Sequence, residues 1–467
     1  MKIQHRISQA TAPTTAQRNL PAPGLLGRRI AFSTIVQYAG KALQLVLGVM
    51  TLKLISNFLS LHGYGVYSAI TEYALFFSVA ANLGIFANLV RKMADQPGEG
   101  KIFVNAMVLR ILTGGIFFVL AILYLALRGA DAVFLLGSGL FLGSLFLDFV
   151  TSVCDGMLQA NYMMGRATLA LALGRLVQLS GVYFIVQRFG GLAAPSGVTA
   201  ALLLFFGMTM AASFLTAGLS FYFVQQKFAR RNVSLHLRID VAFLREIFRT
   251  SLPYGLIFFV NNLYFRFVPD FLGHQFLSSA QFGAFNVSFR IAQVLSLLST
   301  FLMFSALPGL KQYIALKQWK KAGILYKKLA WILLAGGIAI VAFGSLFGPK
   351  IIELLTHKKY FLPEFWFLLP MMLILAAISY GYDLVLISLF ALQKDWWLLK
   401  CEVLSLIIAV LFFAPAFLVE SMELKLFLTV FGAIVGETTM LTMGVLRLKK
   451  IFKKELHLSG EFAIIGA

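Results

Sequence analysis

The sequence predicts an all-α membrane protein with about twelve transmembrane helices, arranged as two six-helix lobes around a central cavity. Hydrophobic residues make up 60% of the 467-residue chain and charged residues only 13%, whereas soluble domains carry about 25% charged residues. The mean hydropathy is +0.85. Lipid accepts only helices or closed barrels, and the apolar runs are continuous over about 20 residues rather than alternating. Helices are therefore expected.

Twelve apolar segments long enough to cross a bilayer follow a polar N-terminal stretch. They are predicted at residues 30–52, 65–90, 104–127, 132–158, 167–187, 198–224, 251–272, 282–306, 329–347, 364–392, 399–418 and 426–446. Residues 1–29 lack the compact apolar core and small-residue cleavage site of a signal peptide, so a cytoplasmic tail is expected there. A second, basic tail is expected at 447–467.

The distribution of lysine and arginine sets the expected orientation. Segments on the side of the N-terminus hold 28 of the 40 basic residues, the opposite side holds 7, and 5 lie inside the apolar segments. Basic residues accumulate on the cytoplasmic side of membrane proteins. The sequence therefore predicts cytoplasmic termini in a bacterial inner membrane, with basic loops that face anionic membrane lipids and no nucleic-acid partner.

A duplicated element indicates two similar lobes. Residues 58–67 read Phe-Leu-Ser-Leu-His-Gly-Tyr-Gly-Val-Tyr, and residues 276–285, at an offset of 218, read Phe-Leu-Ser-Ser-Ala-Gln-Phe-Gly-Ala-Phe. Six spans separate the two copies, and an even number gives them the same orientation, so the duplication is parallel. The predicted lobes are 30–224 and 251–446, joined at 225–250 by a helix that lies on the cytoplasmic leaflet.

The sequence contains no pattern that indicates catalysis. Cys154 and Cys401 fall in apolar segments and are expected to be small buried side chains. The six histidines show no metal-ligand spacing, and neither a P-loop nor a nucleophile elbow is present. We therefore expect a transporter rather than an enzyme, without a cofactor or a bound metal.

Several short motifs resemble one known family. The element at 58–67 is similar to the Leu-Gly-x-x-x-Tyr-Gly-x-Tyr element of polysaccharide exporters, which are oligosaccharide flippases, O-antigen flippases among them, of the multidrug/oligosaccharidyl-lipid/polysaccharide (MOP) superfamily. Asn82-Leu-Gly-Ile85, Arg91 and Ser251-Leu-Pro-Tyr254 resemble further family elements.

This resemblance implies a flippase that moves undecaprenyl-pyrophosphate-linked oligosaccharide repeat units across the inner membrane by alternating access, for surface polysaccharide biosynthesis. It implies a monomer, with a polysaccharide polymerase and glycosyltransferases as candidate partners.

Basic residues inside the apolar segments suit an anionic cargo. A charge at membrane depth costs at least roughly 2.5–3.5 kcal/mol, so it usually faces a wet cavity or a partner. Lys41 and Arg266 lie on the first and seventh spans, which the duplication makes equivalent. Guanidinium and ammonium groups both suit a pyrophosphate. We expect Lys41 and Arg266 to bind it, with Arg290 and Arg175 as secondary ligands.

Other interpretations of these charges are open. Arg110 can extend to the cytoplasmic headgroups. Arg290 can pair with Glu72, because the two occupy matched positions of the repeat. Arg266 and Asp270 are four residues apart on one helix and can neutralise one another.

Polar side chains near Arg266 are candidates for contact with sugars. Asn261 and Asn262 can bind sugar hydroxyls or hold helices together. Tyrosines in spans 7 and 10 are candidates for stacking on sugar rings; these are Tyr254, Tyr264, Tyr380 and Tyr382.

Acidic residues inside the spans are candidates for binding a coupling proton or cation. Asp148 and Asp155 are seven residues apart and share one helix face, and Asp383 lies in span 10. Glu402 and Glu437 lie in spans 11 and 12.

Three functions compete at this point. The first is the flippase. The second is a multidrug or cation antiporter of the same superfamily, which is disfavoured because Lys41 and Arg266 repel cations. The third is a non-transporting membrane scaffold of a polysaccharide-synthesis complex.

Overall fold

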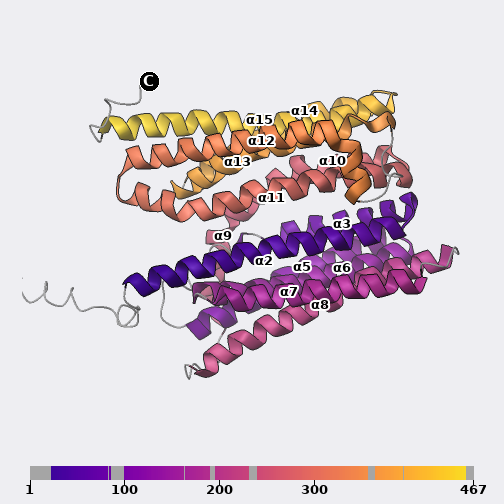
Figure 1. Ribbon diagram of the computed structural model, residues 1–467, viewed down its shortest axis with the longest axis horizontal. Helices are drawn as coiled ribbons and strands as arrows, with labels where there is room; N and C mark the ends of the chain where they lie inside the picture. The colour runs from indigo at the N-terminus through magenta and orange to yellow at the C-terminus, as the bar shows by residue number, and fades with distance from the viewer. Residues whose placement is uncertain are drawn as a thin grey trace, which may run out of the picture.

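The computed structural model describes residues 23–82, 84–85, 99–161, 163–189, 195–230, 239–355, 363–392 and 394–458, and these ranges are almost entirely helical. The helices form two groups that lie side by side (Figure 1). The first group consists of α2 (Pro23–Phe58), α3 (Leu61–Asn82), α5 (Glu99–Leu127), α6 (Ala132–Ala160), α7 (Met164–Phe189) and α8 (Pro195–Arg230). The second consists of α9 (Val241–Asn262), the π-helical η2 (Leu263–Phe267), α10 (Val268–Phe276), α11 (Ser279–Ala315), α12 (Trp319–Leu355), η4 (Pro363–Phe365), α13 (Leu368–Ala391), α14 (Asp395–Phe413), η5 (Ala414–Phe417) and α15 (Met422–Leu458).

The predicted all-α membrane fold is confirmed. Each of the twelve predicted spans overlaps a described helix, with the seventh span distributed over α9, η2 and α10. Within the described ranges, nine helices are long and apolar enough to cross a membrane by length and composition. Three predicted spans fall outside this set. The apolar part of α2 that was searched, Ala42–Phe58, is too short, and α3 and the α9–α10 segment are more polar, since α3 carries Glu72 and α9 carries Arg245, Glu246 and Arg249.

Several helices extend well beyond the predicted apolar spans. The α12 helix covers 319–355 where 329–347 was expected, and α15 continues to Leu458. Residues 447–458 of the expected C-terminal tail are therefore helical. Residues 1–22 lie outside the described part of the chain. Hydropathy marks only the lipid-exposed length of a helix, and the polar turns beyond it stay helical.

The expected linker helix at 225–250 is divided between two elements. Residues up to Arg230 end α8, residues 231–238 lie outside the described part of the chain, and α9 begins at Val241. Asp240 caps α9 by accepting a hydrogen bond from the backbone N–H of Phe243 at 3.0 Å. Ile247 is fully buried in an apolar cluster with residues of α5 and α8, whereas Ile239, Val241 and Phe248 are exposed. Contact of this segment with the cytoplasmic leaflet stays a prediction.

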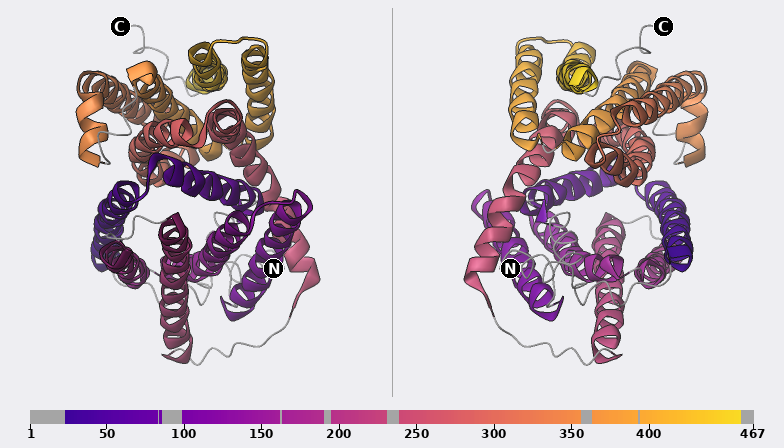
Figure 2. Two further views of the ribbon diagram at one scale, coloured as in Figure 1. Left: turned by 90° about the vertical axis from the view of Figure 1, so that its right-hand side faces the viewer. Right: turned by 90° about the vertical axis from the view of Figure 1, so that its left-hand side faces the viewer.

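The two groups diverge towards the end of the molecule that holds the start of α2 and the end of α15, and they converge at the opposite end (Figure 1). Views along the bundle show α9 running from the first group into the second (Figure 2). At its start, Asp240 accepts a hydrogen bond from Lys101 Nζ of α5 at 2.7 Å and donates its backbone N–H to Asn105 Oδ1 at 2.7 Å. The α9 helix thus connects the two halves on the side of the termini.

The duplicated sequence element forms the contact at the converging end. Gly65 of α3 and Gly283 of α11 are equivalent in the repeat, and each faces the backbone of the other helix. A Cβ on Gly65 would overlap the carbonyl group of Ser279, and a Cβ on Gly283 would lie 2.6 Å from the carbonyl oxygen of Leu61. Only glycine permits this approach, so the two copies close this end of the molecule against each other.

Candidate functional site

A π-helical turn in the middle of the seventh span positions the central side chains. The helix changes from α to π at Leu263 and returns to α at Val268, one residue before Pro269. Single π turns inside α-helices occur frequently at functional sites. On this turn, Arg266 faces α3 of the other half, and Tyr264 faces α14 of its own half.

Glu72 of α3 holds two arginines of the second half. Arg266 binds its carboxylate with two hydrogen bonds, Nε to Oε2 at 2.7 Å and Nη2 to Oε1 at 2.8 Å. Arg290 of α11 approaches Oε1 with Nη2 at 3.1 Å and donates from the same atom to Thr71 Oγ1 at 2.8 Å. The Glu72 side chain is 2% exposed. This two-pronged arrangement is the geometry in which guanidinium–carboxylate pairs are strongest.

The structure decides between the interpretations of these arginines. The pairing of Arg290 with Glu72 is confirmed. The direct ion pair of Arg266 is with Glu72 rather than with Asp270. Asp270 accepts a hydrogen bond from Asn286 Nδ2 at 3.0 Å and interacts with Arg266 through its charge. Asn286 also accepts a long hydrogen bond of 3.4 Å from Arg290 Nε.

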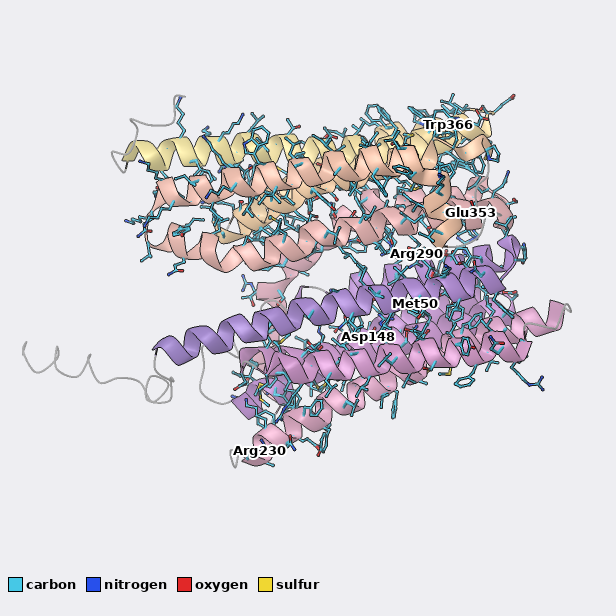
Figure 3. All side chains as sticks on the ribbon, viewed as in Figure 1. Met50, Asp148, Arg230, Arg290, Glu353 and Trp366 are labelled. Atoms are coloured by element: carbon cyan, nitrogen blue, oxygen red, sulfur yellow. The ribbon has the colours of Figure 1, made fainter. Side chains whose placement is uncertain are left out.

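Both arginines border a cavity of about 460 Å³ in the second half. Their side chains are 16% and 22% exposed, so the faces turned away from Glu72 are accessible from the cavity. Arg290 lies at the level between the two halves, towards the converging end (Figure 3). Polar residues of the lining also include Asn261, Asn262, Gln293, Ser296, Thr300, Ser379, Tyr382, Asp383 and Glu437.

The side-chain amides that line this cavity differ in how many hydrogen bonds they make within the protein. Asn261 Nδ2 donates to Tyr264 Oη at 2.9 Å and Glu437 Oε2 at 3.1 Å, while Asn262 Nδ2 donates to the carbonyl of Phe258 at 2.8 Å. Gln293 Nε2 is buried and has no hydrogen-bond partner within the described part of the chain. An orphaned amide donor is costly, and a bound acceptor would satisfy it. Gln293 was not predicted from the sequence, since a glutamine in an apolar helix carries no specific signal.

A second buried acidic cluster lies beside this cavity. Glu402, 0% exposed, accepts hydrogen bonds from Tyr264 at 2.8 Å and Tyr382 at 2.7 Å, and Glu437, 1% exposed, accepts one from Asn261. Tyr264 is 0% exposed, so its predicted stacking on sugar is wrong. Two neighbouring buried carboxyl groups with neutral donors can hold a proton or a small cation. Among the described residues, no group of three or more histidine, cysteine, aspartate or glutamate side chains forms a metal site.

The other predicted coupling acids are hydrogen-bonded to serine or threonine. Asp383 borders the cavity and accepts from Ser299 Oγ at 2.5 Å and Thr300 Oγ1 at 2.9 Å. In the first half, Asp148 and Asp155 of α6 accept from Ser213 at 3.0 Å and Ser220 at 3.3 Å of α8.

Arg175 and Arg110 do not line this cavity. Arg175 of α7 is exposed and donates to Gln178 of its own helix at 2.7 Å, and Asp148 lies in the same half (Figure 3). The side chain of Lys41 lies outside the described residues. Arg110 does not extend to the headgroups: it is 1% exposed and donates to the carbonyl and Oδ1 of Asn82 at 3.0 and 3.1 Å, at the end of α3.

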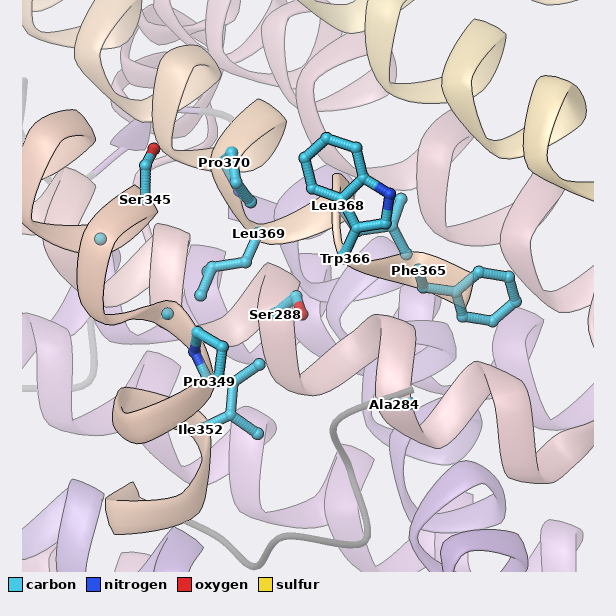
Figure 4. Close-up of a pocket in the computed structure, with 12 residues that line it drawn as sticks. Ala284, Ser288, Ser345, Pro349, Ile352, Phe365, Trp366, Leu368, Leu369 and Pro370 are labelled. Carbon is cyan, nitrogen blue, oxygen red and sulfur yellow. The ribbon is translucent and has the colours of Figure 1, made fainter. Parts of the chain in front are cut away.

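A second pocket, of about 320 Å³, lies among α11, α12 and the start of α13 (Figure 4). Its side chains are apolar apart from the hydroxyls of Ser288 and Ser345 and the indole of Trp366. It offers no charge to an anion. The cavity that Arg266 and Arg290 border is therefore the candidate site.

Comparison with known proteins gives a family and a fold. Residues 26–314 match the family described as "Polysaccharide biosynthesis protein". The sequence matches no curated protein.

Solved structures share the fold at low identity. An inward-facing MATE family multidrug resistance transporter of the MOP superfamily is 15% identical, with a TM-score of 0.71 over 90% of this chain and 99% of its own. An outward-facing one is 16% identical, with a TM-score of 0.66 over 91% and 96%. A MOP superfamily transporter from Pyrococcus furiosus, described by a reverse polarity of its binding pocket, is 16% identical, with a TM-score of 0.64 over the same shares. This multi-pass membrane protein thus has the fold of MOP superfamily transporters.

Proposed function

Because this chain belongs to the polysaccharide biosynthesis protein family, we propose that it is a flippase for undecaprenyl-pyrophosphate-linked oligosaccharide repeat units. The cargo enters from the side of the termini, which faces the cytoplasm of a bacterial cell, and leaves at the opposite side of the inner membrane. Alternating access between the two halves moves it, and the product is used for surface polysaccharide, such as O-antigen.

The observation that carries this proposal is the pair of arginines on one cavity. Arg266 and Arg290 come from different helices, and both line the same cavity with partly exposed side chains. Two guanidinium forks suit the oxygens of a pyrophosphate. The amides of Asn262 and Gln293 lie on the same lining, where the first sugar would sit. A cavity of about 460 Å³ fits a headgroup and its neighbouring sugar rather than a whole repeat unit.

Lys41 stays a proposed ligand from the first half, with Arg175 as a secondary one. Asp148, Asp155 and Asp383 stay candidate coupling acids, and the Glu402–Glu437 cluster joins them. Membrane lipids and the enzymes of polysaccharide synthesis are the proposed partners of a monomer.

A cation antiporter is the second candidate, and a specific observation favours it. Asp383 and Glu437 border the same cavity as the two arginines. Carboxylates there would attract a cationic drug, whereas the arginines would repel it. A non-transporting scaffold is the third candidate and makes no use of the cavity.

A deletion strain complemented with variants tests the three functions. Loss of the protein should abolish surface polysaccharide and accumulate undecaprenyl-linked repeat units in the inner leaflet. Arg266→Gln and Arg290→Gln should each lower export at least tenfold at equal protein level, while Arg249→Gln, at an exposed position of α9, should export normally.

Normal export in the Arg266→Gln/Arg290→Gln double variant would contradict the proposed site. An unchanged polysaccharide level in the deletion strain, with increased sensitivity to cationic drugs, would favour the antiporter. Loss of export in the deletion strain that neither Arg variant reproduces would favour the scaffold.

A further inference from the structure

Glu72 is the group that the two cavity arginines bind in this structure. It comes from the first half of the chain, while both arginines come from the second. Both of its oxygens are engaged, and its side chain is 2% exposed. Asp270 reaches this cluster through Asn286. Within the described part of the chain, Glu72 is the carboxylate in direct contact with both Arg266 and Arg290, while Asp270 lies close enough for its charge to act on both.

The unused donors of the arginines face away from Glu72. Arg266 binds it with Nε and Nη2, and Arg290 with Nη2. No hydrogen bond among the described residues uses Nη1 of either side chain. Because both side chains also border the cavity, an anion that enters there meets the same two guanidiniums from their other side.

We propose that Glu72 is an internal competitor for the anionic group of the cargo: it holds Arg266 and Arg290 while the cavity is empty, and a pyrophosphate displaces it. The proposal rests on the proposed function for the identity of the anion. A carboxylate and a phosphate offer a guanidinium fork the same pair of acceptor oxygens, and the pyrophosphate carries more charge and more oxygens. Glu72 and a pyrophosphate cannot both bind all the N–H donors of Arg266 and Arg290 at the same time.

The competition acts on the contact between the halves. Three charge-assisted contacts join Glu72 to η2 and α11. They lie seven residues along α3 from Gly65, which is about 10 Å at 1.5 Å per residue. The empty transporter is thus held closed at its converging end by its own carboxylate. A cargo that binds both arginines replaces Glu72 as their anionic partner. Movement of α3 away from the second half then leaves neither arginine unpaired, so the contact no longer opposes opening.

Binding of inorganic pyrophosphate to the whole protein in nanodiscs tests the competition. Isothermal titration calorimetry should show that Glu72→Gln lowers the Kd about tenfold, because the competing charge is gone. Arg266→Gln should raise the Kd at least tenfold. Glu353→Gln, at an exposed position of α12, is the matched control and should leave the Kd unchanged. A purely structural role for Glu72 predicts weaker binding in Glu72→Gln, which is the opposite direction.

A second arm identifies the source of the pyrophosphate group. Nanodiscs that contain undecaprenyl pyrophosphate should suppress the binding of inorganic pyrophosphate, and nanodiscs with undecaprenol should not. Tighter binding in Glu72→Gln without this suppression would support the competitor and overturn the lipid-linked cargo. Suppression in the parent together with equal or weaker binding in Glu72→Gln would overturn the competitor and leave the cargo in place.

Glu72→Asp covers the case in which Glu72→Gln does not fold. Aspartate keeps the charge but is one methylene shorter, so it reaches the arginines less well and should give a Kd between those of the parent and the neutral variant. A Kd for Glu72→Asp equal to or above that of the parent would overturn the proposal.

Discussion

Replacing Gly65 by alanine should force the converging end of the molecule open. The added Cβ would lie 2.8 Å from the carbonyl carbon of Ser279 and closer still to its oxygen, whereas ordinary contact begins at 3.4 Å. The obstacle is backbone, so α3 and α11 must separate by roughly 1 Å or lose the closed arrangement. Overpacking of this kind costs about 1–3 kcal/mol. Because α3 is helical in both the closed and the separated arrangement, the higher helix propensity of alanine cancels between them. A penalty of about 2 kcal/mol, in the middle of the overpacking range, lowers the ratio of closed to open molecules roughly 30-fold.

Spin labels on one loop of each half measure this change. Arg128→Cys and Glu420→Cys place labels at exposed positions between α5 and α6 and between α14 and α15, after the buried Cys154 and Cys401 are replaced. Gly65→Ala should add a longer-distance component to the distribution. Gly48→Ala on α2 is the matched control, because its Cβ meets nothing within 4 Å. A Gly65→Ala distribution identical to that of Gly48→Ala would refute the steric argument.

Two further predictions concern stability. Tyr264→Phe removes the hydroxyl that donates to Glu402 and accepts from Asn261, both in buried surroundings, and should lower the free energy of unfolding by about 2 kcal/mol; Tyr183→Phe, 49% exposed, should change it by under about 0.5 kcal/mol. Equal effects of the two variants in mixed-micelle unfolding would contradict the role of the buried hydroxyl. Hydrogen bonds from Lys101 and from the N–H of Phe243 lower the pKa of Asp240 in the folded protein. The Asp240 carboxylate therefore stabilises the fold fully at pH values above its unfolded pKa of about 3.9. This stabilisation is lost as the pH falls through the lower pKa of the folded state. The stability difference between the parent and Asp240→Asn should therefore shrink from about pH 6 to about pH 3, and a difference that grows on acidification would show the sign to be wrong.

The sequence predicts the membrane architecture because lipid imposes it segment by segment. A continuous apolar run of sufficient length can only be a helix in a bilayer, so each predicted span overlaps a described helix. The duplication was readable in short motifs, and the structure places their glycines against each other's helices. The helix ends were predicted less well, since the polar turns beyond the bilayer, such as those of α12, have no hydropathy signal.

The partners in the candidate site were harder to predict. A charged side chain in an apolar span is easy to recognise in the sequence, and the free-energy cost of placing it in lipid indicates a partner or a cavity. This identified Arg266 and Arg290. Which acid neutralises them depends on packing between helices: Arg266 binds Glu72, 194 residues away, rather than Asp270 in its own helix. The same holds for Tyr264 and Glu402, which are 138 residues apart. The π-helical turn that orients both side chains has no compositional signature.

That turn makes two buried acidic groups mechanically dependent on each other. Tyr264 and Arg266 are two residues apart, which is about half a helical turn, and they reach Glu402 on one side and Glu72 on the other. A rotation of η2 about its axis cannot move one without moving the other. The five residues of η2 therefore couple the position of a side chain inside one half to that of a side chain at the boundary with the other half. A rotation of η2 that follows a change at Glu402 would therefore also move Arg266 at the boundary between the halves.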